Sequence, residues 1–405
     1  MAILRKFTHR LFIVLNILAV LLFLLACANS FLHPGRWWVI ALLGLLFPLL
    51  LLFVICFLIV GVSVRTFRPW AVMSLVALLL GWSNIHAFFA LHPASHFSPE
   101  KPPHSIRVLT WNVRSFDNFV TRKKTTPPHR PNMMDFIGSE QADVLCLEEF
   151  YEPLTRHGLE SNITYIQTQL HFPYYYFSRD YGRYSGLFES GVIIFSRFPI
   201  IDTFRHDYAR PDGFRATESL IAADISIGGS STGGDSAGRD SAGSATSTGR
   251  DTFRIFATHL QSVLFRSKEF HDIQIIKNVD DSILDASRSI ALKLRTAFRH
   301  RGDQAEEVRA QLDKSPYPAI ICGDFNDVPN SYAYFTIRGG WQDAFLQKGF
   351  GIGRTYVNIS PTLRIDYILA DPQFDILQCR KFPLPWSDHN PVVADLRLPA
   401  SAEKP

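Results

Sequence analysis

Six short segments of the sequence place side chains that can bind a metal or move a proton within or directly after an apolar run. They contribute Asn112 from LTWNV, Glu148 and Glu149 from VLCLEE, His259 from FATHL, Asp324 and Asn326 from IICGDFN, Asp366 from IDYIL, and Asp388 and His389 from SDHNP. Such runs are typical of buried strands, and in α/β proteins sites form where strands end. We therefore expect these side chains to meet at one edge of a sheet.

The chemistry of this set is that of oxygen ligands and histidine. Carboxylate and amide oxygens are hard ligands, and the five cysteines show neither a zinc spacing nor a disulfide framework. The set therefore favours Mg²⁺, with Mn²⁺ as the alternative, over Zn²⁺. Asp324 and Asn326 are two residues apart, so on an extended chain both can reach one ligand. With histidine for acid–base work, the combination suits metal-assisted attack of water on phosphorus.

Short strands and longer helices must position these residues. Strand-like runs lie at 106–111, 144–147, 191–195, 219–227, 253–258, 319–322, 365–369 and 392–396. Apolar residues recur at helical spacing in 131–141 and 267–312. This mixture predicts a layered α/β sandwich over residues 106–398. Within it, residues 228–249 are nearly all Gly, Ser, Thr, Ala and Asp, which predicts a disordered insertion between two strands.

In their order along the chain, these motifs resemble those of the endonuclease/exonuclease/phosphatase superfamily, as found in a membrane-anchored bacterial member. The matching pieces are the strand ending in Asn112, the L-x-E strand ending in Glu149, and the T-H-L, G-D-F-N, I-D-Y and S-D-H elements. The resemblance implies a four-layer α/β sandwich, in which two mixed β-sheets pack face to face between helices. It also implies a divalent-metal-dependent phosphoric ester hydrolase, since the superfamily includes DNase I-like nucleases, inositol polyphosphate phosphatases and bacterial sphingomyelinases.

The resemblance also implies a role for each matching residue. Metal-binding roles fall to Glu149, Asn112 and Asp388, and catalytic roles to His389, Asp324, His259, Asp366 and Asn326. Asp324 would orient or deprotonate the attacking water, and Asn326 would hold a phosphate oxygen. His389 would contact the scissile phosphate, while Asp366 would fix the tautomer of its imidazole. His259 would help to protonate the leaving oxygen, and Glu148 stands where the family often has Gln.

The first 91 residues are predicted to anchor the chain in a membrane. Three apolar runs, at 11–32, 38–60 and 70–91, have about the 20 residues that cross roughly 30 Å of hydrocarbon as a helix. No acidic residue precedes Glu100. We therefore predict three transmembrane helices, followed by a linker at 92–105. As an alternative, the LLACA segment around Cys27 resembles a lipoprotein or signal-peptidase processing site, and cleavage there would remove one crossing.

Basic residues set the expected orientation of the anchor. They are Arg5, Lys6 and Arg10 before the first run, Arg36 in the first loop, and Arg65 and Arg68 in the second loop. The positive-inside rule then places the N-terminus and the second loop in the cytoplasm. Three crossings would put the sandwich on the extracytoplasmic side of a bacterial inner membrane.

The distribution of charge limits the possible partners. The chain has 41 Lys and Arg residues and 37 Asp and Glu residues, a net charge of +4. Six of the basic and none of the acidic residues precede Glu100, which leaves 35 against 37, a net charge of −2, for the rest. A nearly neutral domain is not a nucleic-acid-coating protein. The expected partners are a phosphate-ester substrate and the membrane, and no obligatory protein partner is indicated.

Three functions remain open at this point. Tethering raises the effective concentration of membrane-bound substrates, which favours a phospholipid headgroup as the substrate of a phosphoesterase. The first alternative is an extracytoplasmic nuclease that acts on DNA or RNA. The second is a catalytically silent binding module tethered to the membrane, and the complete set of site residues argues against it.

Overall fold

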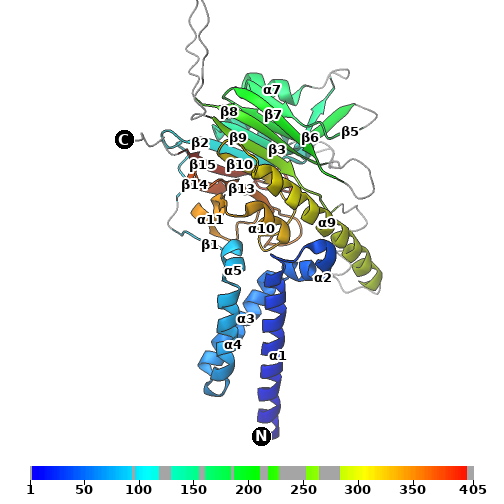
Figure 1. The fold of residues 1–405 in the computed structure, drawn as a ribbon, viewed down its shortest axis with the longest axis vertical. Coiled ribbons are helices and arrows are strands. Elements are labelled where there is room, and N and C mark those ends of the chain that lie inside the picture. Colours follow the sequence, from blue (N-terminus) through cyan, green and yellow to red (C-terminus); the bar gives the residue numbers. More distant parts are fainter. Residues whose placement is uncertain are drawn as a thin grey trace, which may run out of the picture.

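The computed structural model describes residues 2–93, 96–117, 129–154, 160–183, 187–209, 218–227, 252–263 and 283–398. Figure 1 shows an N-terminal group of helices joined to a sandwich of two β-sheets. The insertion predicted at 228–249 lies outside the described residues, as does the first part of the helical pattern at 267–312.

The first sheet is built from β2 (Ile106–Asn112), β3 (Val144–Pro153), β4 (Tyr174–Phe177), β5 (Tyr181–Arg183), β6 (Phe188–Ser196), β14 (Asp375–Lys381) and β15 (Val392–Arg397). Within the described residues their order is β14–β15–β2–β3–β6–β4, with β5 also paired to β6. β2 and β3 are parallel, whereas β2 and β15 are antiparallel, so the sheet is mixed. The carboxyl ends of β2 and β3 therefore meet at one edge.

The second sheet is built from β7 (Ile200–Asp207), β8 (Ser219–Ser226), β9 (Thr252–His259), β10 (Ala319–Asp324), β11 (Gln342–Asp343) and β13 (Asp366–Ala370), in the order β11–β13–β10–β9–β8–β7. β10 runs parallel to β9 and antiparallel to β13. This register places His259 on one side of Asp324 and Asp366 on the other. Three of the predicted site residues are thus neighbours across the sheet.

Helices cover the outer faces of both sheets. α6 (Arg130–Ser139) and α7 (Asn162–Gln169) pack on the first sheet, and α9 (Ile283–Leu312) and α10 (Tyr332–Arg338) on the second, each through its own hydrophobic cluster. A third cluster fills the space between the sheets. The predicted four-layer α/β sandwich is therefore confirmed.

Alternation along the strands sorts side chains between the layers. In β10, Ile320 and Cys322 face the other sheet, whereas Ala319 and Ile321 face the outer helices. Successive strand residues point to opposite faces, so the buried strands read as continuous apolar runs in the sequence. All eight strand-like runs identified in the sequence form strands.

The N-terminal part consists of α1 (Ala2–Ala28), α2 (Pro34–Leu45), α3 (Phe47–Ser63), α4 (Arg68–Leu80) and α5 (Trp82–Phe88). Within the described residues, α1 alone is a straight helix long and apolar enough to cross a membrane, over Leu4–Ala28. The second and third predicted spans are each a pair of helices, bent by 57° between α2 and α3 and by 63° near Gly81. Because proline is tolerated only in the first turn of a helix, Pro48 marks the start of α3.

Residues 92–105, predicted as a linker, pack along the sandwich in the parts that are described. β1 (Ala90–Leu91) pairs with β12 (Phe350–Gly351). Arg107 is 1% exposed, donates hydrogen bonds to the carbonyl oxygens of Ser98 and Pro99, and forms a 2.7 Å ion pair with Asp395. A buried arginine holds its position only when its donors are satisfied. The linker is therefore fastened to the first sheet.

Candidate functional site

Four of the predicted site residues are the inward-facing residues at one end of their strands. Asp324 follows Ile320 and Cys322 in the row that faces the first sheet, and His259 follows Ile255 and Ala257. By the same alternation, Asp366 and Asn112 are the terminal inward-facing residues of β13 and β2. The site therefore opens at the catalytic edge, by which we mean the edge of the sandwich where the apolar layer between the sheets ends.

One oxygen of Asp324 lies at the centre of the cluster. Oδ2 accepts a 3.1 Å hydrogen bond from Nδ2 of Asn112 and lies 3.7 Å from Nε2 of both His389 and His259. Burial, together with the charge of Asp366, raises the pKa of Asp324 to about 6, although the two histidines oppose the shift. A carboxyl group poised in this way can exchange a proton near neutral pH.

Asp366 and His389 form a buried pair. Nδ1 of His389 lies 3.0 Å from both carboxylate oxygens of Asp366. Burial alone would lower the pKa of His389, but the charges of Asp366 and Asp324 hold it well above its usual value. Since Asp366 engages Nδ1, Nε2 is the nitrogen directed at Asp324 and at any substrate there.

Several groups that the sequence did not single out hold His389 in place. Nε1 of Trp111 donates a 2.8 Å hydrogen bond to the carbonyl oxygen of His389, and the backbone N–H of His389 donates to Oγ of Ser387. The ring of Tyr356 meets the imidazole edge-on, with 4.9 Å between centroids. Thr355 accepts the backbone N–H of Asp366. Trp111 and Ser387 lie in quoted motifs without an assigned role, whereas Tyr356 and Thr355 lie in no motif, because only the fold brings them to the histidine.

Glu149 reaches the site through an irregularity in β3. Regular alternation would send Glu148 and Glu149 to opposite faces of the sheet. However, the register of β3 against β6 shifts between Leu147 and Phe150, and Glu149 has a positive φ of 48°. This bulge turns Glu149 so that its Oε1 accepts a 3.2 Å hydrogen bond from Asn112, as Asp324 does. Asn112 thus joins two carboxylates from different sheets.

Asp388 is joined to Asn112 through Ser387, whose Oγ donates a 2.9 Å hydrogen bond to the carbonyl oxygen of Asn112 and lies 3.4 Å from Oδ1 of Asp388. Its Oδ2 is 3.5 Å from Nε of Arg114 and 3.5 Å from Nδ2 of Asn358. Arg114 begins a turn of four consecutive residues, 114–117, with φ between 47° and 59°. Left-handed backbone costs about 1–2 kcal/mol per non-glycine residue, and such strain is concentrated at functional sites. Asp388 is therefore associated with a basic side chain that the sequence did not identify.

The remaining predicted residue, Asn326, lies at the end of β10. Its backbone N–H donates a 2.8 Å hydrogen bond to Oδ1 of Asp324, and its Nδ2 donates to the carbonyl oxygen of Leu260. Asn326 has a φ of 52°, a region that asparagine tolerates better than most residues. In this position Asn326 orients the central aspartate.

Glu148, which precedes Glu149 and has no role predicted from the sequence, is a buried carboxyl group. It is 0% exposed, its Oε1 accepts a hydrogen bond from Thr110, and its Oε2 has no partner among the described residues. Burial raises the pKa of Glu148 well above its usual value, and nearby Cys146, Asp366 and Asp324 add to the shift. The raised pKa favours the neutral acid, in which one oxygen donates and the other accepts, as the NH₂ and the carbonyl oxygen of a glutamine amide do.

We expect Glu148→Gln to raise the midpoint of thermal unfolding (Tm) of the detergent-solubilised protein, more near pH 8 than near pH 5. Because the pKa of Glu148 is higher in the folded protein than the ordinary value of 4.5, its protonation stabilises the fold at pH values below 4.5. This contribution to stability is lost as the pH rises through the folded-state pKa. The amide does not titrate, so it removes this loss. A lower Tm at both pH values would contradict the neutral state of Glu148.

Gly323 permits the close approach of β10 and β9 beside the central aspartate. It has a φ of +143°, and a Cβ atom added there would lie 1.9 Å from the carbonyl oxygen of Thr258. We expect Gly323→Ala to lower Tm by the equivalent of about 3 kcal/mol, because strain and overpacking both act against it. Gly340→Ala is the matched control, since its Cβ would meet nothing within 4 Å. Equal Tm values for the two variants would contradict this assignment.

The site suits a divalent cation. Asp324, Asp366 and His389 each offer one ligand atom within 4.8 Å of one another, and Glu149 shares Asn112 with Asp324. Nε2 of His259 is buried with no hydrogen-bond partner among the described residues. Burial is the main cause of the raised pKa of Asp324, and the charge of Asp366 adds to it, so a bound cation would stabilise the ionised carboxylates. Oxygen donors with unbalanced negative charge fit Mg²⁺ or Mn²⁺.

Solved structures with a similar chain trace were found in several organisms. An endonuclease/exonuclease/phosphatase from Beutenbergia cavernae is 19% identical with a TM-score of 0.48, and the alignment covers 73% of this chain and 72% of that one. The human Nocturnin catalytic domain with bound sulfate is 16% identical with a TM-score of 0.47, covering 74% and 96%. Sphingomyelinase C from Streptomyces griseocarneus is 16% identical with a TM-score of 0.40, covering 72% and 99%.

Two family models match the chain, one over each of its two parts. No curated protein matches the sequence. A family model described as a domain of unknown function matches residues 9–88, which include most of the N-terminal helices. A second family model matches residues 109–389, which contain every site residue described above. The chain therefore belongs to the endonuclease/exonuclease/phosphatase family.

Proposed function

We propose that this protein is a membrane-anchored, Mg²⁺-dependent phosphoesterase that hydrolyses a phosphoester, preferably in a phospholipid headgroup. The observation that carries the proposal is the convergence of Asp324, His259 and the Asp366–His389 pair on one point of the catalytic edge. Membership of the family supports hydrolysis of a phosphate ester. The apolar helix α1 supports attachment to a membrane.

Glu149, Asn112 and Asp388 are the proposed residues for the metal. Asp366 and His389 satisfy each other through Nδ1, so we assign that pair to proton and phosphate handling. Bound Mg²⁺ would offset negative charge on a phosphate oxygen, and Mn²⁺ could serve in its place. The half-buried Glu149 is the carboxylate that the bulge in β3 brings to the edge.

The proposed role of each residue follows from the atom that it directs toward Oδ2 of Asp324. Asp324, held by Asn326, takes a proton from the attacking water, and Nε2 of His389 donates a hydrogen bond to the phosphate. Asp366 stabilises the protonated imidazole as charge develops on phosphorus. His259 lies on the other side of Asp324 and protonates the leaving oxygen. Asn326 is also the proposed contact for a phosphate oxygen.

The experiment that tests hydrolysis uses the full chain in detergent with bis(p-nitrophenyl) phosphate as a soluble diester. We expect Mg²⁺-dependent release of p-nitrophenol that EDTA abolishes and that fresh Mg²⁺ restores. His389→Ala provides the background rate of a contaminating hydrolase. A native rate no higher than that of the variant would refute the enzyme and favour a silent binding module.

Three further substrates separate the lipid proposal from the nuclease. Plasmid DNA, p-nitrophenyl phosphate and phospholipid vesicles are compared under the same conditions. We expect turnover of phospholipid, because the anchor brings the domain to a surface rich in it. Fast nicking of plasmid DNA without lipid turnover would reject the lipid preference in favour of a nuclease.

We further propose that the sandwich lies on the extracytoplasmic side of a bacterial inner membrane. Support comes from Arg5, Lys6 and Arg10 in the first turns of α1 and from Arg65 and Arg68 where α3 gives way to α4. An alkaline phosphatase fused to the C-terminus is active only outside the cytoplasm, so we expect the fusion to be active in bacteria. An inactive fusion would refute this orientation.

A further inference from the structure

Several polar contacts join the N-terminal helices to the sandwich, and we call three of them the clasp. Nδ2 of Asn29 donates a 3.2 Å hydrogen bond to the carbonyl oxygen of Asn330, and Nε2 of His33 lies 3.3 Å from Oδ1 of Asp303. The third contact is a 2.7 Å hydrogen bond from Nη2 of Arg364 to the carbonyl oxygen of Ala87. In Figure 1, α2 accordingly lies beside α9, and α5 lies near α10 and α11 (Ala344–Lys348).

Two contacts of the clasp lie close in the chain to catalytic residues. Asn330 follows Asn326 by four residues, on the loop that leaves β10 at Asp324. Arg364 precedes Asp366 by two residues. Because Asp324 and Asp366 are paired across the second sheet, both clasp residues belong to segments that meet the catalytic edge. The guanidinium of Arg364 itself reaches back to Asp343, which pairs with Leu369 further along β13.

The His33–Asp303 contact is connected to the same edge through α9. Arg301, two residues before Asp303, forms a 3.1 Å ion pair with Asp327 and donates a hydrogen bond to the carbonyl oxygen of Gln261. Gln261 in turn lies two residues after His259. The helix that receives His33 thus holds the segments that follow both His259 and Asp324.

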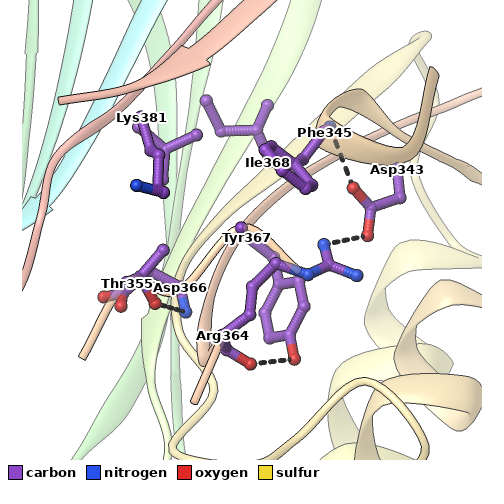
Figure 2. A pocket seen from close by; sticks show the side chains of 10 residues that line it. Asp343, Phe345, Thr355, Arg364, Asp366, Tyr367, Ile368 and Lys381 are labelled. Atoms are coloured by element: carbon purple, nitrogen blue, oxygen red, sulfur yellow. Dashed lines mark hydrogen bonds and ion pairs between the residues drawn. The ribbon is translucent and has the colours of Figure 1, made fainter. Parts of the chain in front are cut away.

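Arg364 gives the clasp a rigid attachment. It is 1% exposed, and Nη1 lies 2.6 Å from Oδ2 of Asp343, as Figure 2 shows. The guanidinium also lies 4.9 Å from the ring centroid of Tyr367, whose hydroxyl donates back to the carbonyl oxygen of Arg364. Since Ala87 is in the last turn of α5, a buried cation there also complements the helix dipole. The end of α5 is therefore fixed against the start of β13.

The clasp also has a defined depth in a bilayer. The candidate span Leu4–Ala28 carries its basic residues, Arg5, Lys6 and Arg10, at its start. The uncharged part from Leu11 to Ala28 is about 27 Å of helix at 1.5 Å per residue, close to the roughly 30 Å of hydrocarbon. Asn29 follows this segment directly, so its contact with Asn330 lies at headgroup level. Phe31 and Trp37, which are 75% and 52% exposed, follow closely, and exposed aromatic side chains of this kind sit at membrane interfaces.

We propose that the clasp turns the catalytic edge toward the bilayer surface, so that the site takes a phosphoester whose phosphate lies at headgroup level in the membrane. The inference rests on the proposed hydrolase and adds where its substrate is presented. The partner of the catalytic edge is thus a lipid surface. The clasp acts by positioning, and the residues that form it are not required for the hydrolysis of a soluble ester.

Orientation is measured first, without reference to activity. Single cysteines replace Asn358, beside Asp388 on the catalytic edge, or Gln373, on the loop that follows β13 at the opposite edge, in a Cys56→Ser background. Each cysteine carries a fluorophore, and the protein is reconstituted in vesicles that contain a lipid spin-labelled on its headgroup. We expect clearly stronger quenching at 358 than at 373. Equal quenching, or stronger quenching at 373, would overturn the proposed orientation whether or not the protein hydrolyses anything.

The function of the clasp is measured with the double variant Asn29→Ala/His33→Ala in vesicles of phosphatidylethanolamine and phosphatidylglycerol. We expect release of water-soluble headgroup to fall at least about tenfold, while hydrolysis of bis(p-nitrophenyl) phosphate stays within about twofold of native. His206→Ala is the matched control, because it removes a histidine–carboxylate contact to Glu307 of the same helix that does not involve the anchor. Equal losses on both substrates, or unchanged lipid turnover, would overturn the role of the clasp.

Discussion

Replacing His389 by alanine is expected to lower kcat for bis(p-nitrophenyl) phosphate by about 10³-fold or more. The imidazole is the group at the centre whose Nε2 can contact phosphate while its Nδ1 is neutralised by Asp366. Steady-state kinetics on the full chain, with circular dichroism to confirm folding, provide the measurement. A loss of less than about tenfold in a folded variant would remove His389 from the catalytic group.

Asp366→Asn tests the same pair through its pH dependence. The charge of Asp366 holds the pKa of His389 high, so its loss lowers that pKa. If the protonated imidazole is the active form, the fall of kcat with rising pH moves to lower pH in the variant. The same pair also contributes to the free energy of unfolding. Protonated His389 stabilises the fold at pH values below its ordinary pKa of 6.5, and this contribution is lost as the pH rises through the folded-state pKa. A profile that moves to higher pH would contradict the pairing.

Replacing Glu149 by alanine is expected to weaken the apparent affinity for Mg²⁺ by about 10²-fold or more, with activity partly restored at high Mg²⁺. Glu149 supplies a carboxylate that the rest of β3 cannot replace, because Glu148 is buried below it and held neutral. Activity against Mg²⁺ concentration is the measurement. Glu152→Ala is a suitable control, since this glutamate of β3 accepts the backbone N–H of Ile163 away from the site. An unchanged Mg²⁺ dependence for Glu149→Ala would exclude Glu149 as a ligand.

The strands that carry the site could be predicted because they are buried on both faces. Runs such as those in β3 and β10 are continuously apolar and end abruptly in charge, as expected of a central strand whose last residue reaches the edge of a sheet. The edge strands β7 and β14 are not predicted from the sequence. β7 reads IIDTFRHD and β14 reads DILQCRK, and partly exposed edge strands of this kind carry too many polar residues to show a clear pattern.

The parts of the site that could not be predicted depend on contacts between distant segments. Glu149 itself was predicted as a site residue, but the bulge that turns it to the edge was not, because its position reflects the pairing of β3 with β6 rather than a signal in β3 itself. The Arg114–Asp388 pair and the ring of Tyr356 against His389 join residues that are widely separated in the chain. The bends between the membrane-proximal helices were also missed. Hydropathy gives the length of an apolar run but is a weak indicator of a bend between two helices within that run.

Because β3 contains a bulge, the number of its residues decides where its two adjacent glutamates lie. Glu148 and Glu149 are adjacent in the sequence, yet Glu148 is buried between the sheets and Glu149 lies at the edge. Deleting one residue between Leu147 and Phe150 would restore regular alternation and leave a single carboxylate for both places. Many single substitutions on β3 can be absorbed by repacking. The site therefore depends on the length of β3 as well as on its residue types, because removing one residue would leave no carboxylate for one of the two positions.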